Sequence, residues 1–476
     1  MTPKEEITQI IEEKKQEFID AADQIWATPE TRFATDRSVA NFYPILEREG
    51  FQVEKGLAHM KNAFVATYGS GKPVIGILAE YDALGNLSQK ADCGQHDPLV
   101  KGGNGHGCGH NLLGTGSLAG AVGIKEYMKR HELKGTIQLF GCPAEESGYG
   151  KAFMARDGVF SDLDVALSWH PMDINSAWAQ SSLAVFQVYY HFKGTAAHAA
   201  AAPEQGRSAL DAAELMNIGV QFLREHMIDA ARVHYAFIDA GGESANVVQP
   251  SATLYYFIRA PKVEQAQEIY ERVNKIAKGA ALMTETQVEI DFDSACANYV
   301  PNRAVTTDLY ENLKEYGSLG LTKADEEYAQ RYYDTLTAET KESLKSRAQL
   351  LHPDASETEI EKMAALPVAT DLAPLHFTNT ASGSTDVGDV SWVVPTAQFM
   401  LACEPQGTPA HSWQWAANGK SAVAHKGVLA AGKVLATTAF DLLTKPELVA
   451  KAKEEHAKML GGKKYISAIP ENVLPR

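Results

Sequence analysis

Short apolar runs recur in the first 180 residues, and each run ends in a cluster of polar residues. The runs cover residues 73–79, 136–140 and 165–169. The clusters that follow contain Glu80 and Asp82, then Glu145 and Glu146, then His170. Near-continuous apolar strands separated by helical segments predict a mostly parallel α/β sheet covered by helices on both faces. Such sheets bind ligands at the carboxyl ends of their strands, so the clusters mark the expected site.

The pattern changes near residue 183 and predicts a small inserted domain. Strands are expected at residues 183–192, 233–238, 254–258 and 288–292, and amphipathic helices at residues 208–224 and 263–282. The order strand, helix, strand, strand, helix, strand is the split βαβ arrangement. We therefore assign residues 183–296 to the inserted domain, and residues 1–182 and 297–476 to the sheet domain.

More helices are expected in the sheet domain. The chain begins with a capping box, in which Thr2 caps the first turn and Glu5 closes the box behind Pro3. Further helices are expected at residues 111–130, in a charged surface excursion at residues 322–363, and at residues 421–443.

Composition narrows the range of partners and the compartment. At 476 residues the chain is long enough for two or three domains. The net charge of −16 argues against nucleic acid and anionic membranes as partners, although a local arginine can still bind an anionic substrate. We expect no signal peptide and no transmembrane segment. The five cysteines are scattered and odd in number, so they predict no disulfide framework and favour a reducing cytoplasm.

Candidate chemistry centres on a glycine-rich loop that carries Cys108 and His110. In an extended loop, positions i and i+2 share a face, so both side chains can reach one ion. The other potential ligands are the Glu145–Glu146 pair, His170 and His411. Thiolate, imidazole and carboxylate are strong metal donors, and their number suggests two ions. One of the paired carboxylates can bind metal while the other takes a proton from water, which predicts a metal-dependent hydrolase.

Other interpretations of these residues stay open. Cys108 is also a candidate nucleophile paired with a histidine, but the carboxylate pair would then have no role. The loop can equally hold a chance Cys and His, with the remaining donors as ordinary solvated or core residues. His425 competes with His411, although His425 falls inside the final helix pattern. A structural zinc site would instead have four ligands and no free carboxylate such as Glu145.

The order of motifs along the chain resembles a known family. The motifs are YDAL (81–84), HGCGHN (106–111), CPAEES (142–147), WHP (169–171), GTAAHAA (194–200), NVVQP (246–250), IRAP (258–261) and PAHSW (409–413). Together they resemble the amidohydrolase branch of the aminoacylase and carboxypeptidase metallopeptidases. Within the branch the greatest similarity is to the p-aminobenzoyl-glutamate hydrolases, through NGHGCGHNLLG, STDVGDVSW and GRSALDA. The resemblance spans nearly the whole chain.

This resemblance implies roles for individual residues. Five of them match the ligands of a binuclear metal site: Cys108, His110, Glu146, His170 and His411. Glu145 matches the general base, and Asp82 matches the carboxylate that orients metal ligands from behind. His198 matches a histidine that polarises the scissile carbonyl, often across a dimer, while Asn246 and Arg259 match residues that hold the substrate carbonyl and carboxylate. The implied fold is a zinc-peptidase-like catalytic domain with a ferredoxin-like α+β lid or dimerisation domain.

Three positions depart from the pattern of the branch. Asn111 stands where most members have Asp, and Glu80 stands where Asp is usual. The triplet at residues 28–30 is Thr-Pro-Glu in place of His-Pro-Glu. We expect Asn111 and Glu80 to lie directly behind the metal ligands and to influence metal identity and affinity, and the triplet to influence neither.

The expected reaction is hydrolysis of the amide between an aryl or acyl group and an amino acid, most readily p-aminobenzoyl-glutamate. The cofactors implied are two divalent ions. The thiolate of Cys108 suggests zinc, the resemblance suggests manganese as readily, and we favour manganese. The expected partners are the small-molecule substrate and another protein chain, in a homodimer or in a heteromer with a paralogue. The alternative is a non-catalytic or partner-dependent subunit, although every ligand position is filled.

Overall fold

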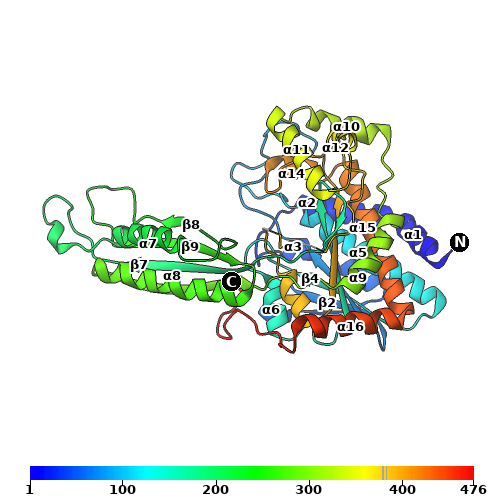
Figure 1. Cartoon of the computed structure of the whole chain (residues 1–476), viewed down its shortest axis with the longest axis horizontal. Coiled ribbons are helices and arrows are strands. Elements are labelled where there is room, and N and C mark those ends of the chain that lie inside the picture. Colours follow the sequence, from blue (N-terminus) through cyan, green and yellow to red (C-terminus); the bar gives the residue numbers. More distant parts are fainter. Residues whose placement is uncertain (378–379, 382) are drawn as a thin grey trace.

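The computed structural model describes residues 1–377, 380–381 and 383–476. The chain forms a larger and a smaller part, each built on its own sheet (Figure 1). The larger part has a seven-stranded sheet in the order β1-β2-β4-β3-β5-β11-β6. Its strands are β1 (Gln52–Lys55), β2 (Phe64–Ser70), β3 (Val74–Glu80), β4 (Gly135–Cys142), β5 (Val165–Met172), β6 (Ser176–Ala177) and β11 (Thr396–Ala402).

The centre of this sheet is parallel and buried on both faces. Strands β4, β3, β5 and β11 run parallel, while β1, β2 and β6 pair antiparallel at the edges. All seven residues of β3 are buried. Ile75 and Ile77 pack into the core on one face, and Val74 and Leu78 pack into the core on the other. The predicted α/β fold with a mostly parallel, doubly covered sheet is therefore confirmed.

Helices cover both faces of the sheet. One face is covered by α1 (Pro3–Glu13), α2 (Lys15–Trp26), α5 (His110–His131), α9 (Arg303–Tyr316) and α15 (Ala422–Thr444), and the other by α6 (Gly150–Arg156) and α13 (Val387–Val393). The other helices of the larger part are α3 (Asp36–Val39), α4 (Tyr43–Arg48), the 3-10 turn η1 (Leu57–His59), α14 (Trp413–Asn418) and α16 (Pro446–Leu460). The predicted capping box of Thr2 and Glu5 at the start of α1 is present.

Helix α15 is the one helix in the described residues that is long and apolar enough to cross a membrane, with a mean hydropathy of 1.3 over its most apolar window. Within the protein, 83% of that window is buried, and the helix packs along α5. This burial is the pattern of a core helix.

The register of the parallel strands aligns the ends that matter for the site. Glu80 pairs in register with Cys142 across β3 and β4, and His170 pairs with Met400 across β5 and β11. The polar residues that follow β3, β4 and β5 therefore emerge at one edge of the sheet, as the sequence predicted.

The smaller part projects to one side of the larger part (Figure 1). Its sheet has the order β10-β7-β9-β8 and is antiparallel throughout. The strands are β7 (Ala184–Lys193), β8 (Arg232–Asp239), β9 (Ser251–Ala260) and β10 (Gln287–Cys296), and the helices are α7 (Ala209–Arg224) and α8 (Val263–Met283), with the 3-10 turn η2 (Pro203–Gln205). All six predicted elements are found, in the ferredoxin-like order. The boundaries drawn at residues 183 and 296 stay a prediction.

The charged excursion forms three helices, α10 (Lys323–Tyr333), α11 (Ala338–Leu351) and α12 (Glu357–Ala364). A capping box of Ser356 and Glu359 starts α12. The excursion contacts the site side of the larger part. The Tyr328 hydroxyl oxygen lies 2.8 Å from Oδ1 of Asp92 and 2.9 Å from Oδ1 of Asn418, and Arg347 pairs with Asp173.

Candidate metal centre

A sharp turn brings Cys108 and His110 together. Gly109 has a left-handed backbone (φ 79°), and His110 is the first residue of α5. A side chain at position 109 would meet Pro171 at 2.9 Å and Trp415 at 3.1 Å, so both the backbone angle and the close approach require glycine. The expected extended loop is therefore a turn into a helix, but the two side chains still converge.

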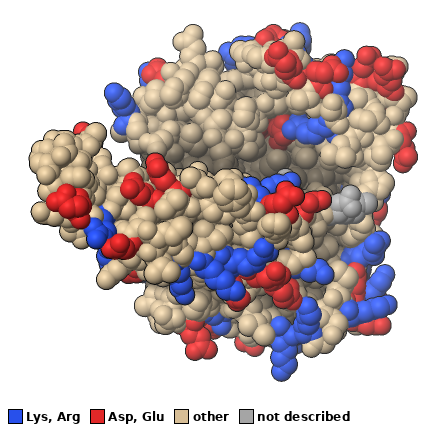
Figure 2. Space-filling model, turned by 60° about the vertical axis from the view of Figure 1, so that its left-hand side comes forward, with Lys and Arg blue, Asp and Glu red and all other residues tan. Residues whose placement is uncertain are grey.

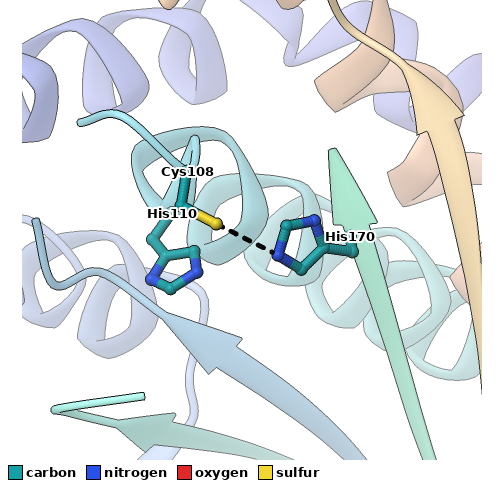
Figure 3. Close-up of side chains that lie close together, drawn as sticks. All are labelled: Cys108, His110 and His170. Atoms are coloured by element: carbon teal, nitrogen blue, oxygen red, sulfur yellow. Dashed lines mark hydrogen bonds between the residues drawn. The ribbon is translucent and has the colours of Figure 1, made fainter. Parts of the chain in front are cut away.

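The predicted donor side chains meet at the carboxyl edge of the sheet. Sγ of Cys108 lies 3.5 Å from Nε2 of His170, and Figure 3 shows the side chains of Cys108, His110 and His170 pointing toward one another. The donor atoms of these three residues lie within 4.8 Å of one another. A second group with the same spacing contains Cys108, Glu146 and His411. Cys108 is common to both groups.

Asp82 fixes the orientation of His110. Its Oδ1 accepts a hydrogen bond from Nδ1 of His110 at 3.0 Å, and its Oδ2 accepts one from the backbone N–H of Glu146 at 3.0 Å. Burial works to raise the pKa of Asp82, but the interactions with His110 outweigh it and the pKa is lowered. A charged Asp82 holds the Nδ1–H of His110 and turns Nε2 toward the site, where a metal ion would take the Nε2 lone pair in place of a proton.

His170 is held in the same way by a backbone carbonyl. Its Nδ1 donates to the carbonyl oxygen of Pro171 at 2.7 Å. Burial, followed by the nearby His110, lowers the pKa of His170 to about 4. A neutral imidazole with its proton on Nδ1 presents Nε2 as a metal donor.

His411 lies next to Glu146. Its Nε2 lies 3.4 Å from Oε2 of Glu146, and its backbone has a left-handed angle (φ 56°) that is uncommon for a residue other than glycine. Its backbone N–H donates to the carbonyl of Gly107 at 2.9 Å, which ties it to the cysteine loop. The competing His425 lies in α15. Its Nε2 is 2.8 Å from Oδ1 of Asp23 in α2, so His425 belongs to neither donor group.

Buried acceptors without partners show that these residues fit a cation. Nε2 of His110, Oε1 of Glu146 and Oε2 of Glu80 are buried and have no hydrogen-bond partner among the described residues. The three side chains are at most 6% exposed. Buried acceptors are normally satisfied, and a group of them facing one another favours a bound positive charge.

Glu145 lies outside the two groups that share Cys108, but its donor atom lies within 4.8 Å of donor atoms of Glu80 and His110. Its side chain is 12% exposed, and it lies 3.9 Å from Nε2 of His110. Burial raises the pKa of Glu145 well above its usual range, and Glu80, Asp386 and Glu146 add to the effect. Burial and Glu146 likewise raise the pKa of the Cys108 thiol. Divalent cations bound in the site would instead lower the pKa of both Glu145 and Cys108.

Two residues behind the site were not predicted. Lys151 and Asp386 are fully buried and form an ion pair of 2.6 Å, and Lys151 also pairs with Glu80 at 2.7 Å. Glu80 was expected behind the metal ligands, and it lies there, 3.3 Å from Nε2 of His110. Nothing in the local sequence marks Lys151 as buried, because it lies in the first turn of a short helix after a glycine-rich turn.

The expectation for Asn111 is not met. Its side-chain amide donates to the carbonyls of Gly419 at 3.0 Å and Ala22 at 3.4 Å, so it joins α5 to neighbouring segments rather than supporting the donors. An aspartate there would face two carbonyl oxygens. Within the triplet at residues 28–30, the Glu30 carboxylate accepts from Ser38 and the backbone of Arg37, outside the donor groups.

The predicted residues of the smaller part divide into two groups. Nη1 of Arg259, near the end of β9, donates to Ser384 at 2.6 Å, which places Arg259 at the junction with the larger part. His198 and Asn246 lie in two loops that meet each other, because the N–H of Ala199 donates to the carbonyl of Asn246. The two loops follow β7 and β8, at the end of the smaller sheet that lies away from Arg259. No described contact joins them to the donor groups.

Comparison with known proteins identifies the family. The model of peptidase family M20/M25/M40 matches residues 76–414. Over 470 residues the chain is 44% identical to one of the subunits of p-aminobenzoyl-glutamate hydrolase from Escherichia coli (strain K12), with 98% of each chain covered. It is 27% identical over 449 residues to the Xaa-Arg dipeptidase of Mus musculus, which covers 90% of this chain and 86% of that protein.

Solved structures show the same fold. The aminobenzoyl-glutamate utilization protein from Klebsiella pneumoniae matches with a TM-score of 0.56 at 18% identity, over 88% of this chain and 97% of that one. A dinuclear metal-binding peptidase of the M20 family from Bacillus subtilis matches with a TM-score of 0.53 at 17% identity, over 88% and 98%. The chain therefore belongs to peptidase family M20/M25/M40, and it is an amidohydrolase of the metallopeptidase type that the sequence predicted.

Proposed function

We propose that this protein hydrolyses the amide bond of an N-aroyl or N-acyl amino acid, with p-aminobenzoyl-glutamate as its preferred substrate. The observation that carries this proposal is that Cys108 is shared by two donor groups, with the carboxylate of Glu145 beside both and part of neither. The substrate is suggested by the similarity to the Escherichia coli p-aminobenzoyl-glutamate hydrolase chain over nearly the whole of both proteins.

Two divalent cations fit the donor set. One would be held by Cys108, His110 and His170, and the other by Cys108, Glu146 and His411. When bound, such ions would polarise the scissile carbonyl and increase the acidity of a water molecule. Manganese and zinc both suit a mixture of one thiolate, one carboxylate and three imidazoles, and we favour manganese.

The protein's own groups would carry the proton and orient the substrate. Glu145 takes the proton of the attacking water and passes it to the leaving amine, a task suited to a carboxylate that lies beside the donor groups that share Cys108 and outside them. Asp82 keeps His110 in one orientation throughout. Arg259 lies at the junction of the two parts and would pair with the carboxylate of the amino acid. The space-filling view shows a hollow with mostly uncharged walls between the projecting part and the upper half of the larger part (Figure 2).

We also propose that the active unit contains two chains. Strand β7 has ten residues, so its ends are about 33 Å apart, and His198 lies beyond the end that points away from the larger part. His198 would therefore stabilise the developing oxyanion, and Asn246 would hold the substrate carbonyl, in the site of the other chain.

An exposed apolar surface on the smaller part fits such an arrangement. Strand β8 is an edge strand, with Phe237 42% and Ile238 59% exposed. Phe222 on α7 is 74% exposed. An edge strand with large apolar side chains is suited to pair with a second chain. A homodimer through this surface is our preferred assembly.

A partner-dependent protein is the second candidate. It is favoured by one observation: a different subunit of the Escherichia coli p-aminobenzoyl-glutamate hydrolase is 33% identical to this chain over 240 residues, which is 47% of this chain and 53% of that protein. In that case the second chain would be a paralogue. A cytoplasmic location is proposed for either assembly, supported by five cysteines that are all free of disulfides.

One experiment tests the proposal and separates the two candidates. The chain is purified alone, stripped of metal, reloaded with Mn²⁺ or Zn²⁺, and assayed for glutamate release from p-aminobenzoyl-glutamate and from a panel of N-acyl amino acids. We expect turnover of p-aminobenzoyl-glutamate by the chain alone. Turnover only after a paralogous chain is added would favour the second candidate. No cleavage of any amide under either condition would refute the proposal.

A further inference from the structure

Two buried atoms face each other behind the donor groups. Nδ1 of His110 donates to Asp82, so Nε2 is the ring atom that faces the site. Oε2 of Glu80 lies 3.3 Å from this Nε2, and both atoms are buried without a hydrogen-bond partner among the described residues. Burial removes the water that would screen the carboxylate, so this contact requires a positive charge. A proton on Nε2 supplies that charge without metal, and a metal ion would supply it when bound.

Glu80 is held in this position by an ion-pair chain. Nζ of Lys151 contacts Oε1 of Glu80 at 2.7 Å and Oδ1 of Asp386 at 2.6 Å. The backbone N–H of Lys151 donates to the second oxygen of Asp386 at 2.8 Å. Glu80 is 3% exposed and the other two side chains are fully buried. Lys151 therefore satisfies one oxygen of Glu80 and leaves the other directed at His110.

We propose that Glu80 is a further ligand of the cation held by Cys108, His110 and His170, and that Lys151 and Asp386 are the residues that position it. The inference rests on the proposed two-cation site. The donor atoms of Glu80, His110 and Glu145 lie within 4.8 Å of one another, so the carboxylate is already at the edge of the donor group.

This role would explain why position 80 is Glu in this chain where Asp is usual in the family branch. A glutamate is one methylene longer than the aspartate usual in the family branch, so it can reach Lys151 with one oxygen and the cation with the other. A carboxylate is a hard oxygen ligand, and adding it to one thiolate and two imidazoles suits Mn²⁺ better. With Glu80 the site should therefore prefer Mn²⁺ over Zn²⁺ more strongly than Cys108, His110 and His170 would without it.

Metal affinity tests this inference without relying on activity. Metal-free wild type and Glu80→Gln are titrated with Mn²⁺ and with Zn²⁺ by calorimetry, and bound metal is counted. Wild type should bind two ions. The variant should bind one ion normally and the other about 10–100-fold more weakly, with the larger loss for Mn²⁺. A purely structural role would weaken both sites and both metals alike, and that result would overturn the inference.

Glu49→Gln is the matched control. Glu49 is 8% exposed and pairs with the buried Lys125 at 2.7 Å, the same distance as the Glu80–Lys151 pair, and it lies outside the donor groups. Both of its metal affinities should stay within about twofold of wild type. Thermal unfolding of every variant shows whether it is folded. If Glu80→Gln fails to fold, Glu80→Gln/Lys151→Met/Asp386→Asn removes the three buried charges of the chain together and receives the same titration.

The outcomes separate the two proposals. Unchanged binding of two ions by a folded position-80 variant overturns the role of Glu80 and leaves the two-cation site intact. Binding of no ion by wild type overturns both. Lys151→Met should weaken one site and reduce its preference for Mn²⁺, as Glu80→Gln does. That result supports the role of Lys151 in positioning Glu80.

Discussion

Arg347 and Asp173 form a two-point ion pair that joins the helical excursion to the strand carrying His170. The two nitrogens of the guanidinium lie 3.0 and 2.7 Å from the two carboxylate oxygens. Asp173 is 3% exposed, stands three residues after His170, and also accepts from the backbone N–H of Gly407. Gly407 precedes His411 by four residues, so one carboxylate connects α11 to both histidine segments.

Arg347→Ala should therefore destabilise the protein. It leaves a buried carboxylate with a single donor, which costs about 2 kcal/mol of unfolding free energy. Denaturant unfolding measures the loss. Lys345→Ala is the control on the same helix, because Lys345 and its partner Glu342 are exposed, and it should change stability by less than about 0.5 kcal/mol. Equal stability of the two variants would show that the excursion is not anchored through Asp173.

Glu145→Gln should remove turnover while leaving metal binding unchanged. Glu145 lies outside the two groups that share Cys108, so its loss removes a proton carrier and no proposed ligand. We expect kcat to fall about 10²–10⁴-fold. Metal content measured on the same sample, before and after dialysis, is the control. A variant that keeps two ions and near-normal kcat would contradict the role of Glu145.

Asp389 should make stability depend on pH between about 4 and 7. Burial raises its pKa to about 7, although the N–H of Ala297 and the hydroxyl of Tyr465 donate to it at 2.9 and 2.7 Å. An aspartate in the unfolded chain has a pKa near 4, about 3 units lower, so the folded state binds the extra proton. The contribution of Asp389 is fully present below about pH 4 and is lost as pH rises to about 7.

Asp389→Asn tests this dependence. The amide keeps the shape of the side chain without the charge, so the loss of stability between pH 4 and pH 7, at most about 1.4 kcal/mol per pH unit, should become smaller in the variant. Unfolding free energies at several pH values measure the difference between the two proteins. Parallel curves for variant and wild type would contradict the assignment.

Phe237→Asp should break the proposed dimer. A charge on edge strand β8 opposes pairing with a second chain, so light scattering should report monomers. Activity should fall with it, because His198 would no longer reach the other site. Leu282→Asp is the control, since Leu282 is 81% exposed on α8 in the same part of the chain and should leave the assembly unchanged. Full activity of a monomeric Phe237→Asp protein would refute the role given to His198.

Much of the fold follows from local sequence. The apolar runs before Glu80, Glu145 and His170 predicted three parallel strands, and their parallel direction alone brings the polar ends together. Periodicity predicted all six elements of the smaller part, because their core positions repeat regularly. These features depend on neighbours in sequence, which a single chain displays directly.

The residues that the sequence analysis missed contact partners that are far away along the chain. Lys151 and Asp386 are 235 positions apart, and each resembles an ordinary surface residue until the fold buries both. Asn111 adjoins His110, yet its amide turns to Gly419, 308 positions away. Neither partner could be identified from spacing, because tertiary packing decides which way these side chains point.

Anomalous scattering from crystals loaded with Mn²⁺ locates the bound metal ions. We expect two peaks about 3.5–4 Å apart. Sγ of Cys108 should contact both, with His110 and His170 on one side and Glu146 and His411 on the other. A single peak, or peaks that contact none of these side chains, would contradict the two-cation site.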